Sequence, residues 1–171
     1  MAVSYQEKTM IIHLRPSQPT DLPFLRKMLY EAVFWRSADS KPAFEEGLAY
    51  PDVKKALADW AEREGDTAVV AANNSMPLGA AWYRYWTNDH FIRGYVDENT
   101  PVLVIGVHPD YRHQGIGGKL IEWLIDHAAN HAVPQISLMV SKDNLAINLY
   151  RQQDFLEIVD TGDAYIMVRT I

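Results

Sequence analysis

Along the chain, short runs of apolar residues alternate with longer segments in which apolar residues recur at helical spacing. The short runs predict strands at 10–15, 67–72, 78–86, 102–108 and 134–140, and a hairpin over 155–170. Helical spacing predicts helices at about 20–35, 51–64, 115–131 and 144–153, the first with Thr20 as its N-cap. Segments 37–50 and 87–100 show neither pattern, so we expect irregular structure there, the second segment lying over or beside a site.

The order of these elements, β-α-α-β-β-β-α-β-α-β-β, indicates an α/β (α+β) fold in one domain over residues 1–171. An antiparallel meander occupies the first half, and two βα units follow it. The strands at 102–108 and 134–140 flank a crossover helix, so we expect them to be parallel. The sequence therefore predicts a mixed, mostly antiparallel central sheet with helices on both faces, preceded by a loosely ordered or disordered segment at 1–9.

Composition and charge exclude several classes of protein. Hydrophobic residues make up 48% of the chain and aromatic residues 11%, which is typical of a folded globular protein. The net charge of −6 disfavours nucleic acid as a partner, because nucleic-acid binding needs basic patches. We see neither an apolar run of about 18 residues nor an apolar leader, so we expect no membrane partner and a cytoplasmic location. Without cysteine, disulfides and thiolate metal sites are excluded.

The stretch HPDYRHQGIGGKL, residues 108–120, places glycines between a predicted strand and a predicted helix. A helix start exposes unpaired N–H groups and a partial positive charge, and glycine lets these donors approach an anion closely. Arg112 and Lys119 add formal positive charge. A tight connection without a ligand is the structural alternative, but the combination favours a phosphate-binding loop.

Two common nucleotide motifs do not fit this loop. In a Walker A loop, His113 would stand where the first glycine is needed, and Leu120 where a Ser or Thr should coordinate magnesium. In a dinucleotide fingerprint, Leu120 replaces the third glycine and Gln135 lies near the position of the acidic residue. The phosphate ligand therefore belongs to another class.

The segment Arg112-His113-Gln114-Gly115-Ile116-Gly117 resembles the R/Q-x-x-G-x-G/A signature of the GNAT superfamily of N-acetyltransferases. Downstream, DNLAINLYRQQDF (143–155) is similar to that family's N-x-A-x-x-L-Y-x-x-x-G-F pattern, and the order of predicted elements matches the family's fold from residue 10 to the end. One departure is Asp154, which stands where glycine is usual and puts the local turn in doubt.

The resemblance implies acetyl-coenzyme A as cosubstrate, no metal, and a set of site residues. The side chain of Arg112 would hold the pyrophosphate together with the backbone N–H groups of His113, Gln114, Gly115, Ile116, Gly117 and Gly118. The strand at 104–108 would pair with the pantetheine arm, and Asn144 would bond that arm. Val107 would donate its N–H to the thioester carbonyl, and Gly106 would mark a bulge or a close backbone approach. Tyr150 would be the general acid for the leaving thiolate, with a place in the core as its structural alternative.

The identity of the base is open. A neutral amine must attack, but an alkylamine with a pKa of about 10.4 is mostly protonated at neutral pH, so desolvation or a base must supply the reactive form. Glu98 is the candidate, because relatives often place a glutamate just before this strand, and Asp97 and His108 are alternatives. The two carboxylates also fit a turn, and the histidine fits a strand end.

Two further features have structural explanations. His127 and His131 lie one helical turn apart, but Ala128 occupies the position of the glutamate in the zinc-protease pattern, so we expect a structural role. Trp82, Tyr83 and their neighbours form an aromatic strand, which fits the core, an acceptor pocket or a dimer interface.

The resemblance thus predicts an N-acetyltransferase that transfers an acetyl group from acetyl-coenzyme A to a primary amine of a small molecule by direct attack. A protein or peptide N-acetyltransferase and a non-catalytic sensor of acyl-coenzyme A remain as alternatives. A homodimer is a further expectation.

Overall fold

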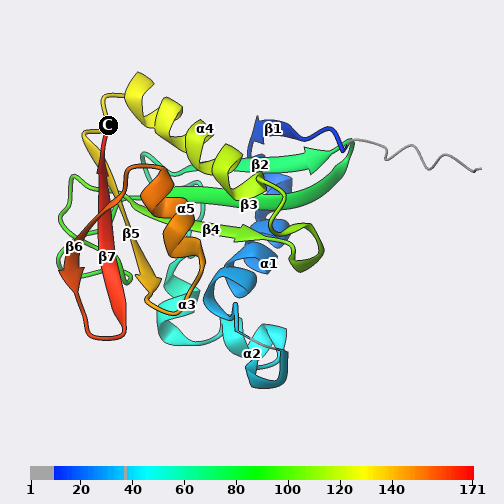
Figure 1. Ribbon diagram of the computed structural model, residues 1–171, viewed down its shortest axis with the longest axis horizontal. Coiled ribbons are helices and arrows are strands. Elements are labelled where there is room, and N and C mark those ends of the chain that lie inside the picture. The colour runs from blue at the N-terminus through cyan, green and yellow to red at the C-terminus, as the bar shows by residue number, and fades with distance from the viewer. Residues whose placement is uncertain (1–9, 37) are drawn as a thin grey trace, which may run out of the picture.

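Seven strands form a single sheet in the order β1-β2-β3-β4-β5-β7-β6 (Figure 1). The computed structural model describes residues 10–36 and 38–171, so the segment 1–9 that we predict to be loosely ordered lies outside the described residues. Every strand expected from the sequence is present. The strands are β1 (His13–Pro16), β2 (Thr67–Asn73), β3 (Met76–Arg84), β4 (Val102–Val107), β5 (Gln135–Ser141), β6 (Leu156–Asp160) and β7 (Ala164–Thr170).

All neighbouring strands of the sheet are antiparallel except β4 and β5. These two strands are parallel, and α4 (Ile116–Asn130) connects them, which is the predicted crossover. The prediction of a mixed, mostly antiparallel sheet is confirmed.

Helices cover both faces of the sheet (Figure 1). On one face, α4 and α5 (Ala146–Gln152) pack over a core that includes Val69, Ala71, Tyr83 and Leu120. On the other face, α1 (Leu22–Val33), α2 (Phe44–Leu48) and α3 (Pro51–Lys55) cover Ala68, Val70 and Trp82. Successive residues of β2 thus enter opposite cores, because side chains alternate along a strand. The aromatic strand is core on both faces.

The predicted helix over 51–64 is wrong beyond Lys55, where α3 ends. Arg84, with 1% of its side chain exposed, pairs with Asp66 (Nε to Oδ1, 2.7 Å). The same guanidinium donates to the carbonyl oxygens of Ala56, Ala58 and Asp59. Carbonyls used in this way are not available to a continuing helix, so a buried cation from a distant strand overrides the apolar stripe.

The start of the first helix also differs from the prediction. A 3-10 turn at Pro19–Asp21 precedes α1, and Thr20 does not cap the helix. Asp21 instead accepts hydrogen bonds from the N–H of Gln18 (2.7 Å) and from the guanidinium of Arg15 on β1 (2.7 Å). This pairing fixes the start of α1 against the sheet.

Of the two segments expected to be irregular, 37–50 contains a short helix and 87–100 is a loop. Within 37–50, which we expected to be irregular, α2 forms at Phe44–Leu48, and a Cβ on its Gly47 would overlap the ring of Phe34. Gly47, which in the sequence argues against a helix, therefore allows α2 to pack closely against Phe34. The segment 87–100 is a loop, as predicted, apart from a single bridge between Thr87 and His90.

Candidate active site

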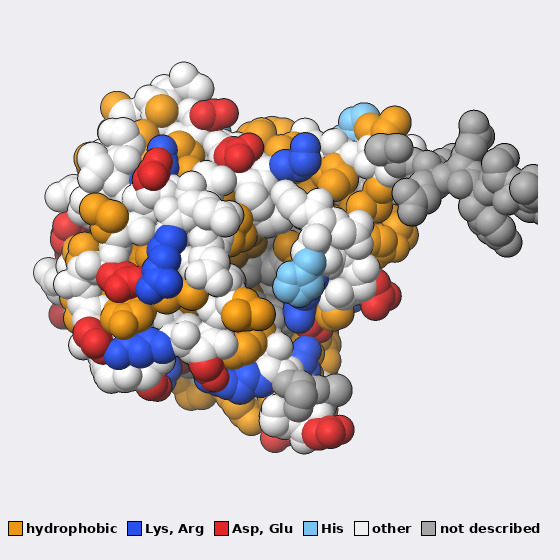
Figure 2. Space-filling model, viewed as in Figure 1, with side chains coloured by type: hydrophobic (Ala, Val, Ile, Leu, Met, Phe, Trp, Pro, Cys, Tyr) orange, Lys and Arg blue, Asp and Glu red, His pale blue; other side chains and the backbone are white. Residues whose placement is uncertain are grey.

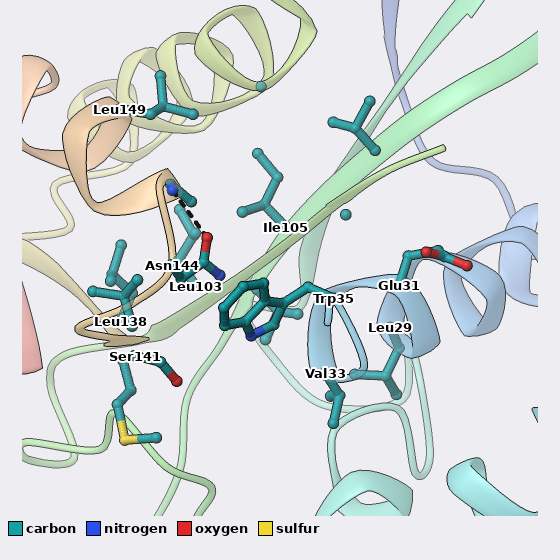
Figure 3. A pocket seen from close by; sticks show the side chains of 18 of the residues that line it. Leu29, Glu31, Val33, Trp35, Leu103, Ile105, Leu138, Ser141, Asn144 and Leu149 are labelled. Atoms are coloured by element: carbon teal, nitrogen blue, oxygen red, sulfur yellow. Dashed lines mark hydrogen bonds between the residues drawn. The ribbon is translucent and has the colours of Figure 1, made fainter. Parts of the chain in front are cut away.

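The main cleft opens where β4 and β5 separate. The described register of these two strands contains one Cα pair, Val102 with Ser137, and the Ser137 N–H donates to the carbonyl of Pro101 (3.0 Å). Beyond that pair the strands diverge, and a cleft of about 1160 Å³ lies between residues of α1, the loop before α4, and α5. Figure 2 shows a hollow on this face of the molecule, and Figure 3 looks into the cleft.

Gly106 lets α1 approach the wall of this cleft. A Cβ at this position would overlap the carbonyl group of Met28 on α1, so only glycine fits. The ladder with β3 continues regularly through the pair Ala80 and Gly106. The sequence allowed either a bulge or a close backbone approach at this glycine; the structure shows the close approach, to α1, and no bulge in the ladder with β3.

The backbone of β4 presents donors to the cleft. The His108 N–H donates to the carbonyl of Leu78 (2.8 Å), so His108 and every second residue before it pair with β3. The N–H groups of Val107 and Ile105 therefore point to the opposite edge of the strand, where both residues line the cleft. Val107 was singled out as a donor from the sequence; Ile105 is a second donor of the same kind, one ladder step further from the glycine loop.

The glycine loop turns into α4 at the rim of the cleft. His113 and Gly115 both have left-handed backbone (φ of 61° and 81°), and Gly115 is the N-cap residue of α4. The first N–H groups of α4 have no partner within the helix, so they are free to bind an anion. The cleft-lining residues of this loop and helix start are His113, Gly115, Ile116, Gly117 and Gly118, whereas Gln114 does not line the cleft and donates to the carbonyl of Asp110 (3.4 Å).

Arg112 is committed to protein partners. Its Nε donates to the carbonyl of Val107 (3.1 Å), and its Nη2 lies 2.8 Å from Oε2 of Glu31 on α1. Lys41 shares that same carboxylate oxygen (3.0 Å). The guanidinium therefore ties the loop to β4 and α1, which is a positioning role that the sequence did not predict, because Glu31 is 81 positions away.

Asn144 and Trp35 lie on opposite sides of the cleft (Figure 3). The Oδ1 of Asn144 accepts the N–H of Ala146 (2.9 Å), which fixes the side chain at the start of α5 and leaves its amide N–H₂ free to donate. Trp35 reaches from the end of α1 into the middle of the view, between Glu31 and Asn144 (Figure 3). Asn144 thus lies where a ligand along the β4 edge would meet it.

The sequence allowed Tyr150 to be either a core residue or a general acid in the site, and its position is compatible with both roles. The residue is buried, with 8% of its surface exposed, and its ring packs edge-on against Phe155. It also lines the cleft, and among the described residues its hydroxyl makes no hydrogen bond. Burial raises the pKa of Tyr150 well above its ordinary value, so the hydroxyl keeps its proton until a strong base forms beside it.

The turn after Tyr150 forms in spite of Asp154. This residue adopts the left-handed conformation (φ of 60°) in which glycine is usual. The Phe155 N–H donates to the carbonyl of Tyr150 (3.0 Å), and the Asp154 carboxylate accepts from Arg169 (3.1 Å). The departure from the family pattern therefore changes the residue and not the turn.

Glu98, the candidate base, is not among the residues that line the cleft. Its carboxylate is exposed and accepts the N–H of Asn88 (3.3 Å). Asp97 likewise holds its own turn, accepting from Asn99 N–H and from the hydroxyl of Thr100. The geometry gives both carboxylates the structural role that the sequence offered as an alternative, and a catalytic role for Glu98 stays a prediction.

Further residues line the cleft beside those discussed above, and two of them, Ile92 and Arg93, belong to the loop 87–100 that was expected to lie over or beside a site. Gly94 (φ of 99°) packs against Val102 and Met139, so the loop 87–100 crosses the sheet at the end of β4 opposite to the glycine loop. The further residues come from the segment after α1, the start of α3, this loop and β5. They are Trp35, Tyr50, Asp52, Ile92, Arg93 and Met139.

Two findings bear on metals and membranes. Within residues 10–36 and 38–171, no group of three or more His, Cys, Asp and Glu side chains is arranged to hold a metal ion. His127 instead bonds the hydroxyl of Tyr83 (2.8 Å) and stacks between Trp123 and His131. No helix in the described part of the chain is long and apolar enough to cross a membrane.

Comparisons with known proteins agree with this geometry. The model of the acetyltransferase (GNAT) family matches residues 30–155. An acetyltransferase from Sodalis glossinidius is 38% identical over 63 residues, which are 36% of this chain and 44% of the relative. The chain thus spans less than half the length of the curated relatives it matches.

Solved structures extend the likeness to almost the whole chain. The PaiA N-acetyltransferase from Thermoplasma acidophilum in complex with coenzyme A has a TM-score of 0.68 at 18% identity, covering 95% of this chain and 100% of that chain. The structure of yncA, a putative acetyltransferase from Salmonella typhimurium with its cofactor acetyl-CoA, has a TM-score of 0.64 at 21% identity, covering 93% of each chain. At these identities the likeness shows the fold, and the fold predicted from the resemblance is confirmed.

Proposed function

Because the chain belongs to the acetyltransferase (GNAT) family, we propose that it transfers the acetyl group of acetyl-coenzyme A to a primary amine of a small molecule by direct attack. One observation carries the proposal: a single cleft connects the free N–H groups at the start of α4, the free edge of β4 and the hydroxyl of Tyr150. These are an anion site, a hydrogen-bonding edge and a proton donor, in the arrangement that a thioester on a diphosphate carrier requires.

The diphosphate belongs at the glycine loop. Residues Gly115 to Gly118 offer backbone donors at a helix start, and the space where a Cβ of Gly115 would stand is open. Arg112 holds this loop in place through Glu31 and the Val107 carbonyl, so we assign it to positioning in addition to charge. Lys119 in the first turn of α4 adds positive charge.

The arm of the carrier follows from the free edge of β4. Val107 and Ile105 direct their N–H groups to the gap that β5 leaves open, so an extended chain with amide groups can pair there as a strand would. Asn144 faces the same gap from the start of α5, with its amide N–H₂ free. The acyl end then lies deep in the cleft, toward Val102.

The cosubstrate supplies an activated acetyl group as a thioester, and the residues of the chain assist its transfer. A β4 N–H, from Val107 or Ile105, stabilises the negative charge on the carbonyl oxygen as the amine nitrogen forms its bond to the acetyl carbon. Tyr150 donates its proton to sulfur as the carbon–sulfur bond breaks. The amide product forms when the attacking nitrogen loses a proton.

Among the described residues, the carboxylates of Glu31 and Asp52 line the cleft, so both are candidates to accept the amine proton. Glu31 is already shared by Arg112 and Lys41. Asp52 contacts Lys55 at 3.4 Å and is 71% exposed, so it keeps lone pairs free to accept a proton directly or through water. We assign the base to Asp52 on this ground, with Glu98 as the alternative that sequence reasoning supplied.

A thiol-release assay tests the proposal. The protein is incubated with acetyl-coenzyme A and a panel of small primary amines, and with peptides that have a free N-terminus or a lysine, and free coenzyme A is measured. Faster release with small amines supports the proposal, and faster release with peptides favours a protein acetyltransferase. Binding of coenzyme A by calorimetry without release for any acceptor would favour a sensor.

A homodimer and a cytoplasmic location stay predictions. The edge strand β6 supports the first, because Leu156, Ile158 and Val159 are 70%, 49% and 44% exposed along an unpaired edge of the sheet. Such an edge is open to pairing with another strand. Light scattering on the purified protein should give twice the mass of 19.5 kDa, and a monomer mass would contradict the dimer.

A further inference from the structure

Arg93 has no ionic partner among the described residues, whereas most of the other arginines have one. The chain contains nine arginines, all of them among the described residues. Seven pair with a carboxylate, and Arg63 lies over the ring of Trp86. Arg93 makes no ion pair, hydrogen bond or ring contact to any described residue, and it lines the cleft. A guanidinium left unpaired at a ligand site is available to bind an anion.

The position of Arg93 is fixed by its neighbour. Gly94 packs against the backbone of Leu138 and Met139 and against Val102, at distances of 3.0–3.1 Å from where a Cβ would stand. This contact places the loop across the point where β4 and β5 separate. Arg93 is exposed and lines the cleft near this point, on the part of its wall that the residues of the glycine loop do not form, and it also borders a neighbouring hollow with Thr161 and Asp163.

The other cations of the cleft are already committed. Arg36 pairs with Asp143 (3.2 Å) and packs on the ring of Trp35, and Arg112 pairs with Glu31. Two apolar residues, Ile92 and Met139, line the cleft together with Arg93. Within the described part of the chain, this half of the cleft thus combines an arginine without an ionic partner with apolar side chains and the carboxylate of Asp52.

On these observations we infer that the acceptor is a primary amine bearing a carboxylate and an apolar side chain, an amino acid of the apolar class, and that Arg93 binds its carboxylate. The inference rests on the proposed function and narrows its substrate class. An acceptor whose carboxylate is capped as an amide loses the charge that the guanidinium binds. A hydrogen bond to a charged group is worth about 1.5–3 kcal/mol, which corresponds to a preference of roughly tenfold to a hundredfold.

The test compares kcat/KM for leucine, methionine and phenylalanine with kcat/KM for their amides. Amides have less basic amines, so the quantity to compare is the acid-to-amide ratio of wild type divided by that of R93Q, in which the difference in basicity cancels. We expect the acid-to-amide ratio of kcat/KM to be at least tenfold lower in R93Q than in wild type, and R93K to retain part of the preference for the acid. The matched control is R26Q, because Arg26 is an exposed arginine of α1 that pairs with Glu45 outside the cleft lining, and it should leave the ratio unchanged.

An acid-to-amide ratio that is the same in wild type and R93Q would overturn the inference while leaving the acetyltransferase proposal intact. If no amine is turned over, the proposed function fails, and a binding measurement then decides about Arg93. Calorimetry with N-acetyl-leucine and N-acetyl-leucine amide, in the presence of coenzyme A, should show tighter binding of the acid to wild type and no difference for R93Q. Equal binding of both compounds to wild type would also overturn it.

Discussion

The Nε of Arg112 lies 3.1 Å from the carbonyl oxygen of Val107, so the arginine of the glycine loop holds the last residue of β4. The other side of the same guanidinium pairs with Glu31 on α1. Lysine carries the same charge as arginine but cannot make both contacts at once, because it lacks the planar fork of donors. The variant R112K therefore separates the charge from the positioning.

We expect R112K to lower kcat by roughly tenfold to a hundredfold, because a small displacement of the reacting groups is costly, while the KM for acetyl-coenzyme A changes little. Steady-state kinetics at saturating amine measure both constants. The variant K41Q is the matched control, since Lys41 shares the Glu31 carboxylate without contacting β4. A rise in KM with kcat unchanged would show that Arg112 acts as a phosphate ligand only.

Removing the hydroxyl of Tyr150 should separate chemistry from binding. The variant Y150F should reduce turnover by about a hundredfold to ten-thousandfold, the range for a lost general acid, and leave the affinity for coenzyme A unchanged. The ring stays in place against Phe155, so the fold should persist. Y165F, outside the cleft lining, should behave as wild type. Full activity of Y150F would show that Tyr150 is not the general acid and serves only in the packing of the core.

The two candidate bases can be told apart by a pair of isosteric variants. We expect D52N to lower kcat about a hundredfold, and E98Q to stay within about twofold of wild type, because Asp52 lines the cleft and Glu98 does not. The kcat of both variants should be measured from pH 6 to pH 10. Loss of activity in E98Q alone would restore the base that the sequence suggested.

The contact between β4 and α1 leaves no room for a side chain at Gly106. We expect G106A to lower the free energy of unfolding by about 3 kcal/mol, the upper end for overpacking, because the obstacle is the Met28 backbone. The variant G118A provides the control, since a Cβ there would be 3.7 Å from its nearest neighbour and alanine favours a helix. Denaturant unfolding of both variants gives the comparison, and equal stability would show that α1 can move away from the strand.

Stability should depend on pH through His127. Burial, reinforced by the neighbouring His131, holds the pKa of His127 below its ordinary value of 6.5. Below that pH the unfolded chain takes up a proton that the folded protein resists, so the contribution is complete above pH 6.5 and is lost as the pH falls toward the lowered pKa. The midpoint of denaturant unfolding should therefore fall less between pH 7 and pH 5 in H127Q than in wild type.

The exposed His13 of β1 supplies the control for that measurement. H13Q should keep the pH dependence of wild type. The same pH dependence in H127Q and H13Q would contradict a lowered pKa of His127 in the folded protein.

The sequence predicted those parts of the fold and site that are local in the chain. The strands, α4 and the glycine loop each follow from a short stretch of residues, and their patterns agree with the structure. The helix predicted after Pro51 ended early because Arg84, far along the chain, takes its carbonyl oxygens. A pattern within one segment carries no information about such a partner.

The same reason separates the two halves of the site. The half of the cleft proposed to bind the diphosphate lies within 112–118, so its residues could be named from the sequence. The half proposed to bind the acceptor is assembled from the segment after α1, the start of α3, the loop at Arg93 and β5, which lie far apart in the chain. The partner of Arg112 was missed for the same reason, since α1 brings Glu31 to it from the other end of the domain.

The separation of β4 from β5 also has a mechanical consequence. The strands before the gap and those after it share one rung of pairing, between Val102 and Ser137. If acetyl-coenzyme A binds in this gap as proposed, its pairing with β4 would extend the hydrogen bonding of the sheet there. A ligand that binds only the folded protein also raises the free energy of unfolding, so the protein should be more stable with the cosubstrate bound.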